Sequence, residues 1–119
     1  MIKITVSRDD DVQGTLELPN RLEMFVGLTI KMLETVNIKN NDYTGESSDV
    51  LKNFRGGGLK GIINRMGDKF MRLTHIVKTQ KMSVQTESFY DTCLDLANYC
   101  VILCIASDTL SVEGDLWND

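Results

Sequence analysis

The sequence has 119 residues and a mass of 13.4 kDa, and 42% of its residues are hydrophobic and 25% charged, which is typical of one ordinary soluble domain. A chain of this length can bury roughly two-thirds of its unfolded surface, so it needs neither disulfides nor a structural metal. The net charge of −4, the pI near 4.9 and the aromatic content of 7% argue against nucleic acid as a partner.

Hydropathy bears on two further classes of protein. The longest uninterrupted apolar run, Cys100 to Ala106, is far shorter than the roughly 20 residues of a membrane span. The first residues, MIKITVSRDDD, lack the long apolar stretch of a signal peptide. We therefore expect a cytoplasmic protein with no membrane partner.

Residues 1–18 alternate between apolar and polar side chains, which is typical of β-strands. The alternating apolar positions are Ile2, Ile4, Val6, Leu16 and Leu18. The pattern is interrupted at Arg8–Gly14, so we expect a short β-hairpin whose turn is Asp9-Asp10-Asp11. The open edges of such a hairpin can pair with another subunit, and we expect a homo-oligomer.

The next segment predicts a first helix. Asn20 follows Pro19 and can cap the helix, and the apolar residues that follow are spaced by three and four, as on one buried face. These positions are Leu22, Phe25, Val26, Thr29, Met32, Leu33 and Val36. We expect the helix to end near Asn37–Asn41 and the polar residues Lys39–Gly58 to form a loop.

Two further helices are predicted, one from close to Leu59 and one from Thr86 or Ser88 to about Ser107. Their apolar positions are Leu59, Ile62, Ile63, Met66, Phe70, Leu73 and Val77, and then Phe89, Cys93, Ala97, Cys100, Val101, Cys104 and Ile105. This near-heptad spacing favours a small antiparallel helical bundle. The fold class is therefore mainly α, a single domain with a helical body at 20–107 and an acidic tail at 108–119 that is either loose or docked.

Three cysteines, Cys93, Cys100 and Cys104, lie within twelve residues of the third predicted helix. The sequence has no CxxC pair, and His75 is its only histidine, so the ligand set of a zinc site is missing. We expect the cysteines to be small, buried apolar residues.

Charge is unevenly distributed over the last two helices. Residues 52–81 carry eight basic residues and one acid, whereas residues 82–119 carry seven acids and no basic residue. Spacings of three and four place the members of each set on one helix face. The second helix presents Arg65, Asp68, Lys69 and Arg72, and the third presents Glu87, Asp91, Asp95 and Asn98.

Repulsion between the aligned acids must be relieved from outside their helix, because that helix holds no lysine or arginine. A Mg²⁺ ion is one candidate, since it takes carboxylate oxygens and completes its shell with substrate phosphates. The basic face of the second helix is the other, and direct pairing would then make a purely structural ion network. The sequence leaves both interpretations open.

A glycine run, Gly56-Gly57-Gly58, leads into the second helix and is followed by Lys60. Such a run can present backbone N–H groups to phosphate at a helix N-terminus, assisted by a lysine. A flexible turn is the alternative interpretation, and the GxxxxGK[ST] pattern of a Walker motif is absent.

Three blocks of sequence carry a family resemblance. They are Lys39-Asn40-Asn41-Asp42-Tyr43, Arg65-Met66-Gly67-Asp68-Lys69-Phe70-Met71-Arg72-Leu73 and Glu87-Ser88-Phe89-Tyr90-Asp91-Thr92-Cys93-Leu94-Asp95-Leu96-Ala97-Asn98-Tyr99. They resemble the patterns KNxDYG, RxxDKxxRL and ESxxDTxxDLANY of the nucleotide-modification-associated domain family of phages and bacteria. That family is similar to the all-α MazG-like nucleoside triphosphate pyrophosphohydrolases. The resemblance covers residues 22–106.

The resemblance implies a nucleotide bound through Mg²⁺ or Mn²⁺ in a MazG-like bundle. The implied catalytic acids are Glu87, Asp91 and Asp95, which with Asp68 would hold the metal. The implied nucleotide contacts are Lys60, Arg65, Lys69, Arg72, Asp42 and Asn98, with Tyr99 beside Asn98. The sequence departs from the patterns at Thr44, which precedes Gly45, and in spacing its acids by four where MazG-like enzymes pair an ExxE with an ExxD.

Three functional hypotheses follow from these observations. The first is a Mg²⁺-dependent nucleotide pyrophosphohydrolase, acting in phage nucleotide metabolism and in the host cytoplasm if a phage encodes it. The second is a binding module that sequesters a nucleotide signal of host defence without cleaving it. The third is a structural protein in which the acidic and basic faces pair.

Overall fold

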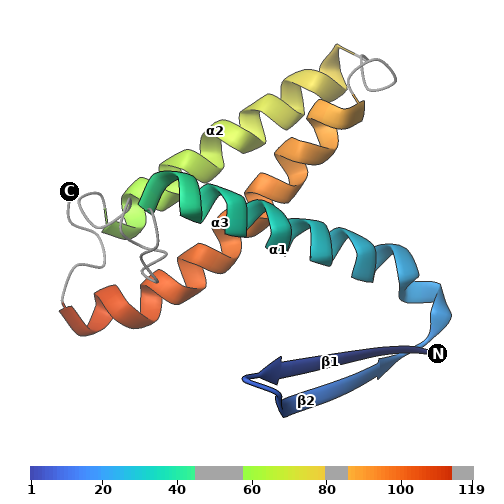
Figure 1. The fold of residues 1–119 in the computed structure, drawn as a ribbon. Helices are drawn as coiled ribbons and strands as arrows, with labels where there is room; N and C mark the ends of the chain where they lie inside the picture. Colours follow the sequence, from blue (N-terminus) through green and yellow to red (C-terminus); the bar gives the residue numbers. More distant parts are fainter. Residues whose placement is uncertain (45–57, 80–85, 114–119) are drawn as a thin grey trace. The chain divides into compact units, whose positions relative to one another are not determined.

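The computed structural model describes residues 1–44, 58–79 and 86–113 and, among these, the side chains of 1–39, 58–79 and 89–108. The described residues form an N-terminal two-stranded hairpin and three α-helices (Figure 1), so the predicted mainly α class with a β-hairpin is confirmed. The chain divides into two compact units, Met1–Lys31 and Met32–Asp119. Each unit is described by itself.

The first unit opens with the predicted hairpin. Strand β1 (Ile2–Arg8) pairs antiparallel with β2 (Asp11–Leu18). Asp9 and Asp10 make the turn with φ angles of 53° and 67°. Two-residue hairpin turns require such left-handed conformations, which Asp tolerates better than most residues.

The second strand is longer than the alternation predicts, because it begins at Asp11 and not after Gly14. A register irregularity lies between Val6 and Ser7. A bulge of this kind inserts an extra residue in one strand, so the apolar–polar alternation breaks while the pairing continues. The interruption in the pattern is therefore the mark of a bulge within the hairpin.

The hairpin leads through a short 3₁₀ helix, η1 (Asn20–Leu22), into helix α1 (Glu23–Thr44). The prediction that Asn20 caps the helix is wrong, because Asn20 lies inside η1, whose N-cap is Pro19. The Oδ1 atom of Asn20 instead accepts a hydrogen bond from the amino group of Met1. Asn20 therefore ties the start of β1 to the start of the helical region.

No residue of the first unit is buried. Phe25, expected on the buried face of the first helix, is 74% exposed. Within this unit the only other regular element of any length is a two-stranded hairpin, which is too small to bury a helix face. The apolar face of α1 is thus present in the sequence but has no core in its own unit.

Helix α1 continues into the second unit and ends at Thr44, beyond the predicted end near Asn37–Asn41. The first residues of the predicted loop at 39–58 are therefore helical, and residues 45–57 lie outside the described structure. Helix propensity is a weak prior that tertiary contacts override, and the last turns of α1 make contacts with α3 that are described below.

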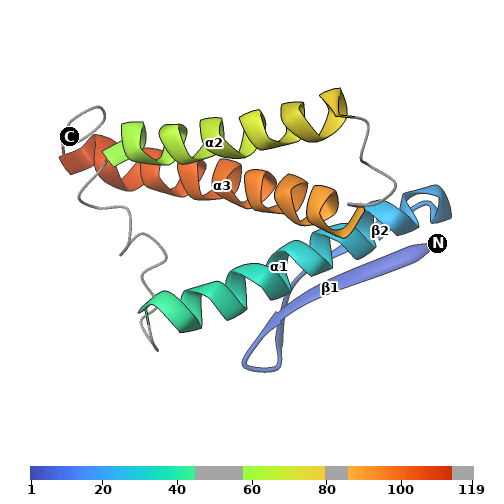
Figure 2. The same cartoon turned by 90° about the horizontal axis from the view of Figure 1, so that it is seen from above.

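Helices α2 (Gly58–Lys78) and α3 (Thr86–Glu113) lie side by side and antiparallel in the second unit (Figures 1 and 2). The predicted starts of both helices are confirmed. Gly58, the first residue of α2, is buried and has a φ of 59°, a conformation that favours glycine over other residues. The third helix runs six residues beyond the predicted end at Ser107, so the first half of the predicted tail is helical.

The core of the second unit lies between α2 and α3. Ile62 of α2 and Ala106 of α3 are completely buried, and partly buried apolar side chains pack around them. These neighbours are Leu59, Met66, Tyr99, Ile102 and Leu103. The only other buried large apolar residues among those described are Ile76 and Leu94, so the core is small.

The predicted buried face of the third helix is wrong at four positions. Cys100 and Cys104 are exposed, as are Val101 at 51% and Ile105 at 41%, while Cys93 is only partly buried. The residues of α3 that are buried include the polar Thr92 and Asn98. Because α3 is apolar on more than one side, the spacing of its apolar residues cannot tell which side faces α2.

Helix α3 also contains a stretch, Phe89–Asp108, that is long and apolar enough to cross a membrane, with a mean hydropathy of 1.4. This criterion rests on length and composition only, and the core helix of a soluble protein also satisfies it. The absence of a membrane partner stays a prediction.

Candidate functional site

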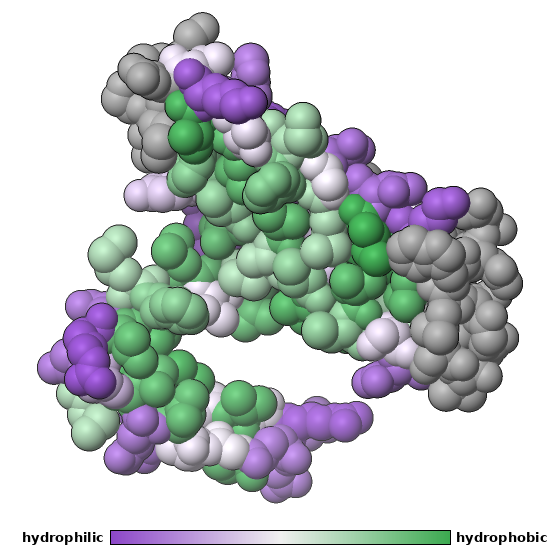
Figure 3. Space-filling model, turned by 180° about the vertical axis from the view of Figure 1, so that it is seen from behind, coloured by the Kyte–Doolittle hydropathy of each residue, from purple (hydrophilic) through white to green (hydrophobic). Residues whose placement is uncertain are grey.

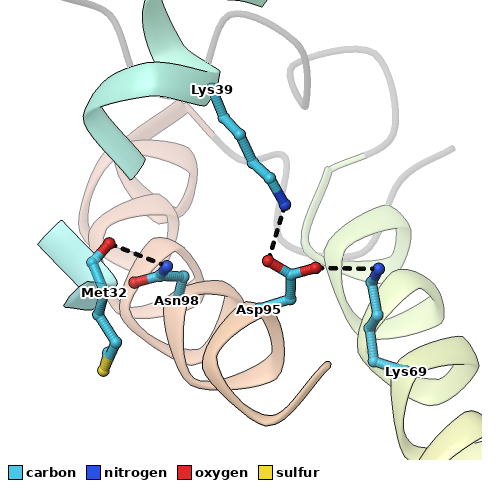
Figure 4. Close-up of polar contacts among 5 residues, drawn as sticks. All are labelled: Met32, Lys39, Lys69, Asp95 and Asn98. Carbon is cyan, nitrogen blue, oxygen red and sulfur yellow. Dashed lines mark hydrogen bonds and ion pairs between the residues drawn. The ribbon is translucent and has the colours of Figure 1, made fainter. Parts of the chain in front are cut away.

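The polar centre of the second unit is the carboxylate of Asp95, in the middle of α3. One of its oxygens accepts a hydrogen bond from Lys39 Nζ of α1 at 2.7 Å, and the other accepts one from Lys69 Nζ of α2 at 3.2 Å (Figure 4). The two lysines are 56 and 26 residues away in sequence. One carboxylate thus joins all three helices of the unit.

This carboxylate is ionised over a wider pH range than an ordinary aspartate. Burial by itself works to raise the pKa of Asp95, but the hydrogen bonds and positive charges of Lys39 and Lys69 outweigh it, so the net effect holds the pKa below its usual value. The Asp95 side chain is 15% exposed, whereas the lysines are 47% and 27% exposed. The negative charge is therefore the most enclosed part of the cluster.

A pocket of about 310 Å³ opens beside this cluster. Its described lining residues are Thr35, Lys39, Asp91, Leu94 and Asp95. Residues four apart share a helix face, so α1 contributes Thr35 and Lys39 from consecutive turns and α3 contributes Asp91 and Asp95 in the same way. The pocket thus combines a hydroxyl, an ammonium group and two carboxylates with one apolar side chain, that of Leu94.

Asn98 fixes α1 against α3 one turn beyond the pocket. Its Nδ2 atom donates a hydrogen bond to the backbone carbonyl of Met32 at 3.2 Å (Figure 4), and the residue is 9% exposed. The amide nitrogen of Asn98, which the resemblance assigns to a nucleotide contact, is therefore used inside the protein. This contact and the Lys39–Asp95 pair hold the last turns of α1 in place.

The structure brings together some of the predicted site residues and separates others. Lys69 meets Asp95 directly, and Asp91 lies in the same pocket. Four other predicted residues lie on α2 and are not among the described lining residues of that pocket: Lys60, Arg65, Asp68 and Arg72. The side chains of Glu87 and Asp42 lie outside the described residues, although both belong to helices by their backbone.

Metal binding was expected from Glu87, Asp68, Asp91 and Asp95 together. Within the side chains that are described, no three His, Cys, Asp or Glu residues are gathered closely enough to hold an ion. The structure therefore does not join Asp68 to Asp91 and Asp95. The three cysteines have free thiols, and their assignment as non-ligands stays a prediction.

Lys39 and Thr35 are the polar pocket residues that the sequence did not single out. Lys39 opens the first of the three resemblance blocks, but it stood in a segment predicted to be a loop, so no helix face could be assigned to it. Extending the first helix beyond its predicted end would have identified Lys39, because Lys39 then lies one turn after Thr35. The glycines Gly56 and Gly57 of the predicted phosphate loop lie outside the described residues.

Comparison with known proteins adds no assignment: no family model matches the chain, and no curated protein or solved structure is significantly similar to it.

Proposed function

We propose that the protein binds a nucleoside triphosphate in the pocket beside Asp95 and acts on it as a Mg²⁺-dependent pyrophosphohydrolase of the MazG-like kind. The observation that carries the proposal is a pocket of about 310 Å³ lined by Lys39, Asp91 and Asp95. Lys69 of a third helix contacts the same Asp95 carboxylate. Lysines can neutralise phosphate oxygens as point charges, and carboxylates are the usual protein ligands of a phosphate-bound Mg²⁺.

The sequence blocks provide a second, independent support. Lys39 comes from the first resemblance block, Lys69 from the second, and Asp91 and Asp95 from the third. These blocks are widely separated in the sequence, yet each contributes to the same cluster. Such a convergence is expected of a site that binds one ligand.

The two carboxylates fit a metal that is brought in by phosphates. Asp91 and Asp95 are on consecutive turns of one rigid helix and line the same pocket, and Mg²⁺ commonly uses one or two carboxylates together with phosphates and water. When bound, the ion would neutralise the phosphates and lower the pKa of a coordinated water.

The chain's own residues have separable roles in this proposal. Lys39 and Lys69 would exchange part of their hydrogen bonding to Asp95 for contacts with the phosphates. There they would stabilise the negative charge that develops on the α and β phosphates. Asp91 and Asp95 would orient the attacking water and hold its proton, with Glu87 as a further acid one turn earlier on α3. Cleavage between the α and β phosphates would give a nucleoside monophosphate and pyrophosphate.

The second candidate is a protein that binds a nucleotide without cleaving it. One observation favours it: both oxygens of Asp95 already accept hydrogen bonds from lysines, which leaves this carboxylate less available to a metal. A site with strong cations and a weak metal centre retains phosphates better than it activates water.

The test is a nucleotide panel with and without Mg²⁺ or Mn²⁺, read by isothermal titration calorimetry for binding and by pyrophosphate release for cleavage. We expect Lys39→Ala and Lys69→Ala each to weaken nucleotide binding at least tenfold, because each removes a phosphate contact. Asp91→Asn should abolish pyrophosphate release while leaving most of the nucleotide affinity. Lys78→Ala and Glu34→Gln, which change exposed charges outside the pocket, should alter neither.

Each outcome selects one function. Binding with pyrophosphate release that Asp91→Asn abolishes supports the enzyme. Binding without release in the wild type rejects the enzyme and supports the nucleotide-sequestering protein. If no nucleotide binds, with or without metal, both are rejected and the Lys39–Asp95–Lys69 cluster is a structural ion network.

A further inference from the structure

The pocket beside Asp95 contains one polar group that makes no hydrogen bond among the described residues, the hydroxyl of Thr35. Lys39 and Asp95 bind each other at 2.7 Å, and Asp91 also has an interaction partner within the protein. The Thr35 hydroxyl can therefore bind a ligand without first losing a contact inside the protein.

Two other threonines of the helices satisfy their hydroxyls internally. Thr29 of α1 and Thr74 of α2 each donate a hydrogen bond to the backbone carbonyl four residues earlier, at 2.8 Å and 3.0 Å. Helical threonines commonly make this bond. Thr35 is partly buried and makes no such bond in the described structure, so its hydroxyl remains available to the contents of the pocket.

Two contacts show in which direction α1 crosses α3. The Lys39 ammonium binds Asp95, and the backbone carbonyl of Met32 accepts a hydrogen bond from Asn98 (Figure 4). Residue numbers thus fall along α1 as they rise along α3, so the two helices run antiparallel at this point. Thr35 lies between Met32 and Lys39 along α1. It is therefore level with the stretch of α3 between Asp95 and Asn98.

Asp91 lies on the other side of the Lys39–Asp95 pair. It precedes Asp95 by one turn of α3, about 6 Å, in the direction away from Asn98. Thr35 precedes Lys39 by one turn of α1, in the direction toward Asn98. The free hydroxyl and the Asp91 carboxylate are therefore at opposite ends of the pocket, with the ion pair between them.

We infer that Thr35 binds the sugar of the nucleotide, through a hydrogen bond between its hydroxyl and the 3′-hydroxyl of the sugar. This inference rests on the proposed function, in which Lys39 contacts the phosphates and Asp91 holds the phosphate-bound metal. A nucleotide whose phosphates occupy that end of the pocket extends its sugar toward the other end. Thr35 then determines which sugars the site accepts.

The chemistry of the pocket also suits a sugar. A sugar ring presents hydroxyl groups together with apolar C–H groups, and Thr35 offers a hydroxyl that can both donate and accept. Leu94 lines the same pocket and offers an apolar surface. The 3′-hydroxyl is nearer to the 5′-phosphates along the covalent chain than the 2′-hydroxyl, so it is the one within reach of a group one turn from Lys39.

The hydrophobic surface of the helix pair offers fewer partners to such a ligand. Figure 3 shows α2 and α3 from behind, with hydrophobic side chains over much of the visible face. A sugar phosphate has many polar groups, whose hydration must be replaced by hydrogen bonds on binding. The pocket supplies such groups from two helices, namely Thr35 and Lys39 of α1 with Asp91 and Asp95 of α3.

The inferred contact names a substrate class. The 3′-hydroxyl is free in a mononucleotide and is linked to phosphate within a nucleic acid chain. A site that hydrogen-bonds this hydroxyl favours free mononucleotides, because an analogue without it leaves the Thr35 hydroxyl without its partner. The acidic pI near 4.9 agrees with a substrate other than a polynucleotide.

The test compares 2′-deoxyadenosine triphosphate with its 2′,3′-dideoxy analogue, which lacks only the 3′-hydroxyl. Isothermal titration calorimetry with Ca²⁺ in place of Mg²⁺ measures binding without turnover. We expect the wild type to prefer the deoxynucleotide by about three- to tenfold, which is the range of one neutral hydrogen bond. Thr35→Val, which replaces the hydroxyl by a methyl group, should bind both nucleotides with the affinity that the wild type has for the dideoxy analogue.

Two variants and one further ligand serve as controls. Thr35→Ser retains the hydroxyl and should retain the preference for the deoxynucleotide. Thr29→Val makes the same substitution on the same helix, outside the described lining of the pocket, and its preference should equal that of the wild type. Inorganic triphosphate has no sugar, so Thr35→Val should bind it as the wild type does. Circular dichroism of each variant verifies that the helices are retained.

Three results would overturn this inference while the proposed nucleotide function stands. One is a wild type that binds both nucleotides equally, a result that needs no variant. Another is a Thr35→Val variant with intact helices that keeps the preference for the deoxynucleotide. The third is a Thr35→Val variant that also loses affinity for inorganic triphosphate, since Thr35 would then contact a phosphate. If the wild type binds no nucleotide at all, the proposed function and this inference both fail.

Discussion

The two sides of the α2·α3 layer differ in a way that reverses the usual distribution of residues. On the side facing α1, the polar Asn98 is buried and the carboxylate of Asp95 is largely enclosed by two lysines. On the other flank of α2, Phe70 and Val77 are more than half exposed. The polar groups on the first side have hydrogen-bond partners within the chain. The apolar side chains on the second side are left exposed.

This difference shows how function and assembly are divided between the two surfaces. Enclosed charges require fixed partners, and the partners of Asp95 come from the same chain. An exposed apolar side has a driving force for association but no partner in the described residues. The polar pocket and the exposed apolar side chains of α2 can therefore be altered separately.

The largest expected effect comes from the core between the two sides. Ile62→Ala should lower the free energy of unfolding by about 2–5 kcal/mol, because it leaves a cavity at a completely buried position. Ile38→Ala on α1, where the side chain is 60% exposed, should cost less than about 1 kcal/mol. Urea unfolding followed by circular dichroism measures both. Equal costs would mean that the layer has no core of its own.

A smaller effect is expected from the polar side. Asp95→Ala should cost about 1–2 kcal/mol, because it leaves two lysines without their shared acceptor, and the exposure of Lys39 limits the loss. Lys39→Ala should cost less than Lys69→Ala, since Lys39 is the more exposed lysine. The same urea titrations test the order. A variant Asp95→Ala as stable as the wild type would show that this side is held by apolar contacts alone.

The smallest effect is a pH dependence that belongs to the polar side. The pKa of Asp95 is lower in the folded protein than its ordinary value of 3.8, so the folded state favours the ionised form. This contribution to stability is complete well above pH 3.8 and is lost as the pH falls through the lower pKa of the folded state. Urea midpoints between pH 6 and pH 2.5 should decrease less in Asp95→Asn than in the wild type. Identical slopes would contradict the assignment.

Much of the fold could be predicted because it depends on local patterns. The hairpin follows from the alternation after Ile2 and from the Asp9-Asp10 turn, and the start of α2 follows from the glycine run before Leu59. The ends of α1 and α3 could not be predicted, because each helix continues beyond its pattern. For α1 the cause is visible: contacts of Lys39 and Asn98 with the partner helix hold turns whose own residues are weak helix formers.

The candidate site could be predicted only in part. The pairing of the basic face of α2 with the acids of α3 was one of the two interpretations that the charge pattern left open, and the Lys69–Asp95 pair is an instance of it. Lys39 was not identified, because its contribution depends on how α1 crosses α3. Asn98 was assigned to a ligand, but the structure uses its amide within the protein.

The sequence alone determined that there are three helices, which stripes on them are charged and which are apolar, because spacing along a helix fixes what shares a face. Only the tertiary structure decided which stripe of α3 is buried. That helix has apolar residues on several sides, and burial depends on which side α2 and α1 occupy. Helices α1 and α2 occupy the side of α3 that bears Thr92, Asp95 and Asn98. On that side the two lysines bind Asp95 and the backbone carbonyl of Met32 accepts a hydrogen bond from Asn98. Cys100 and Cys104 lie on the other side of the helix and are exposed.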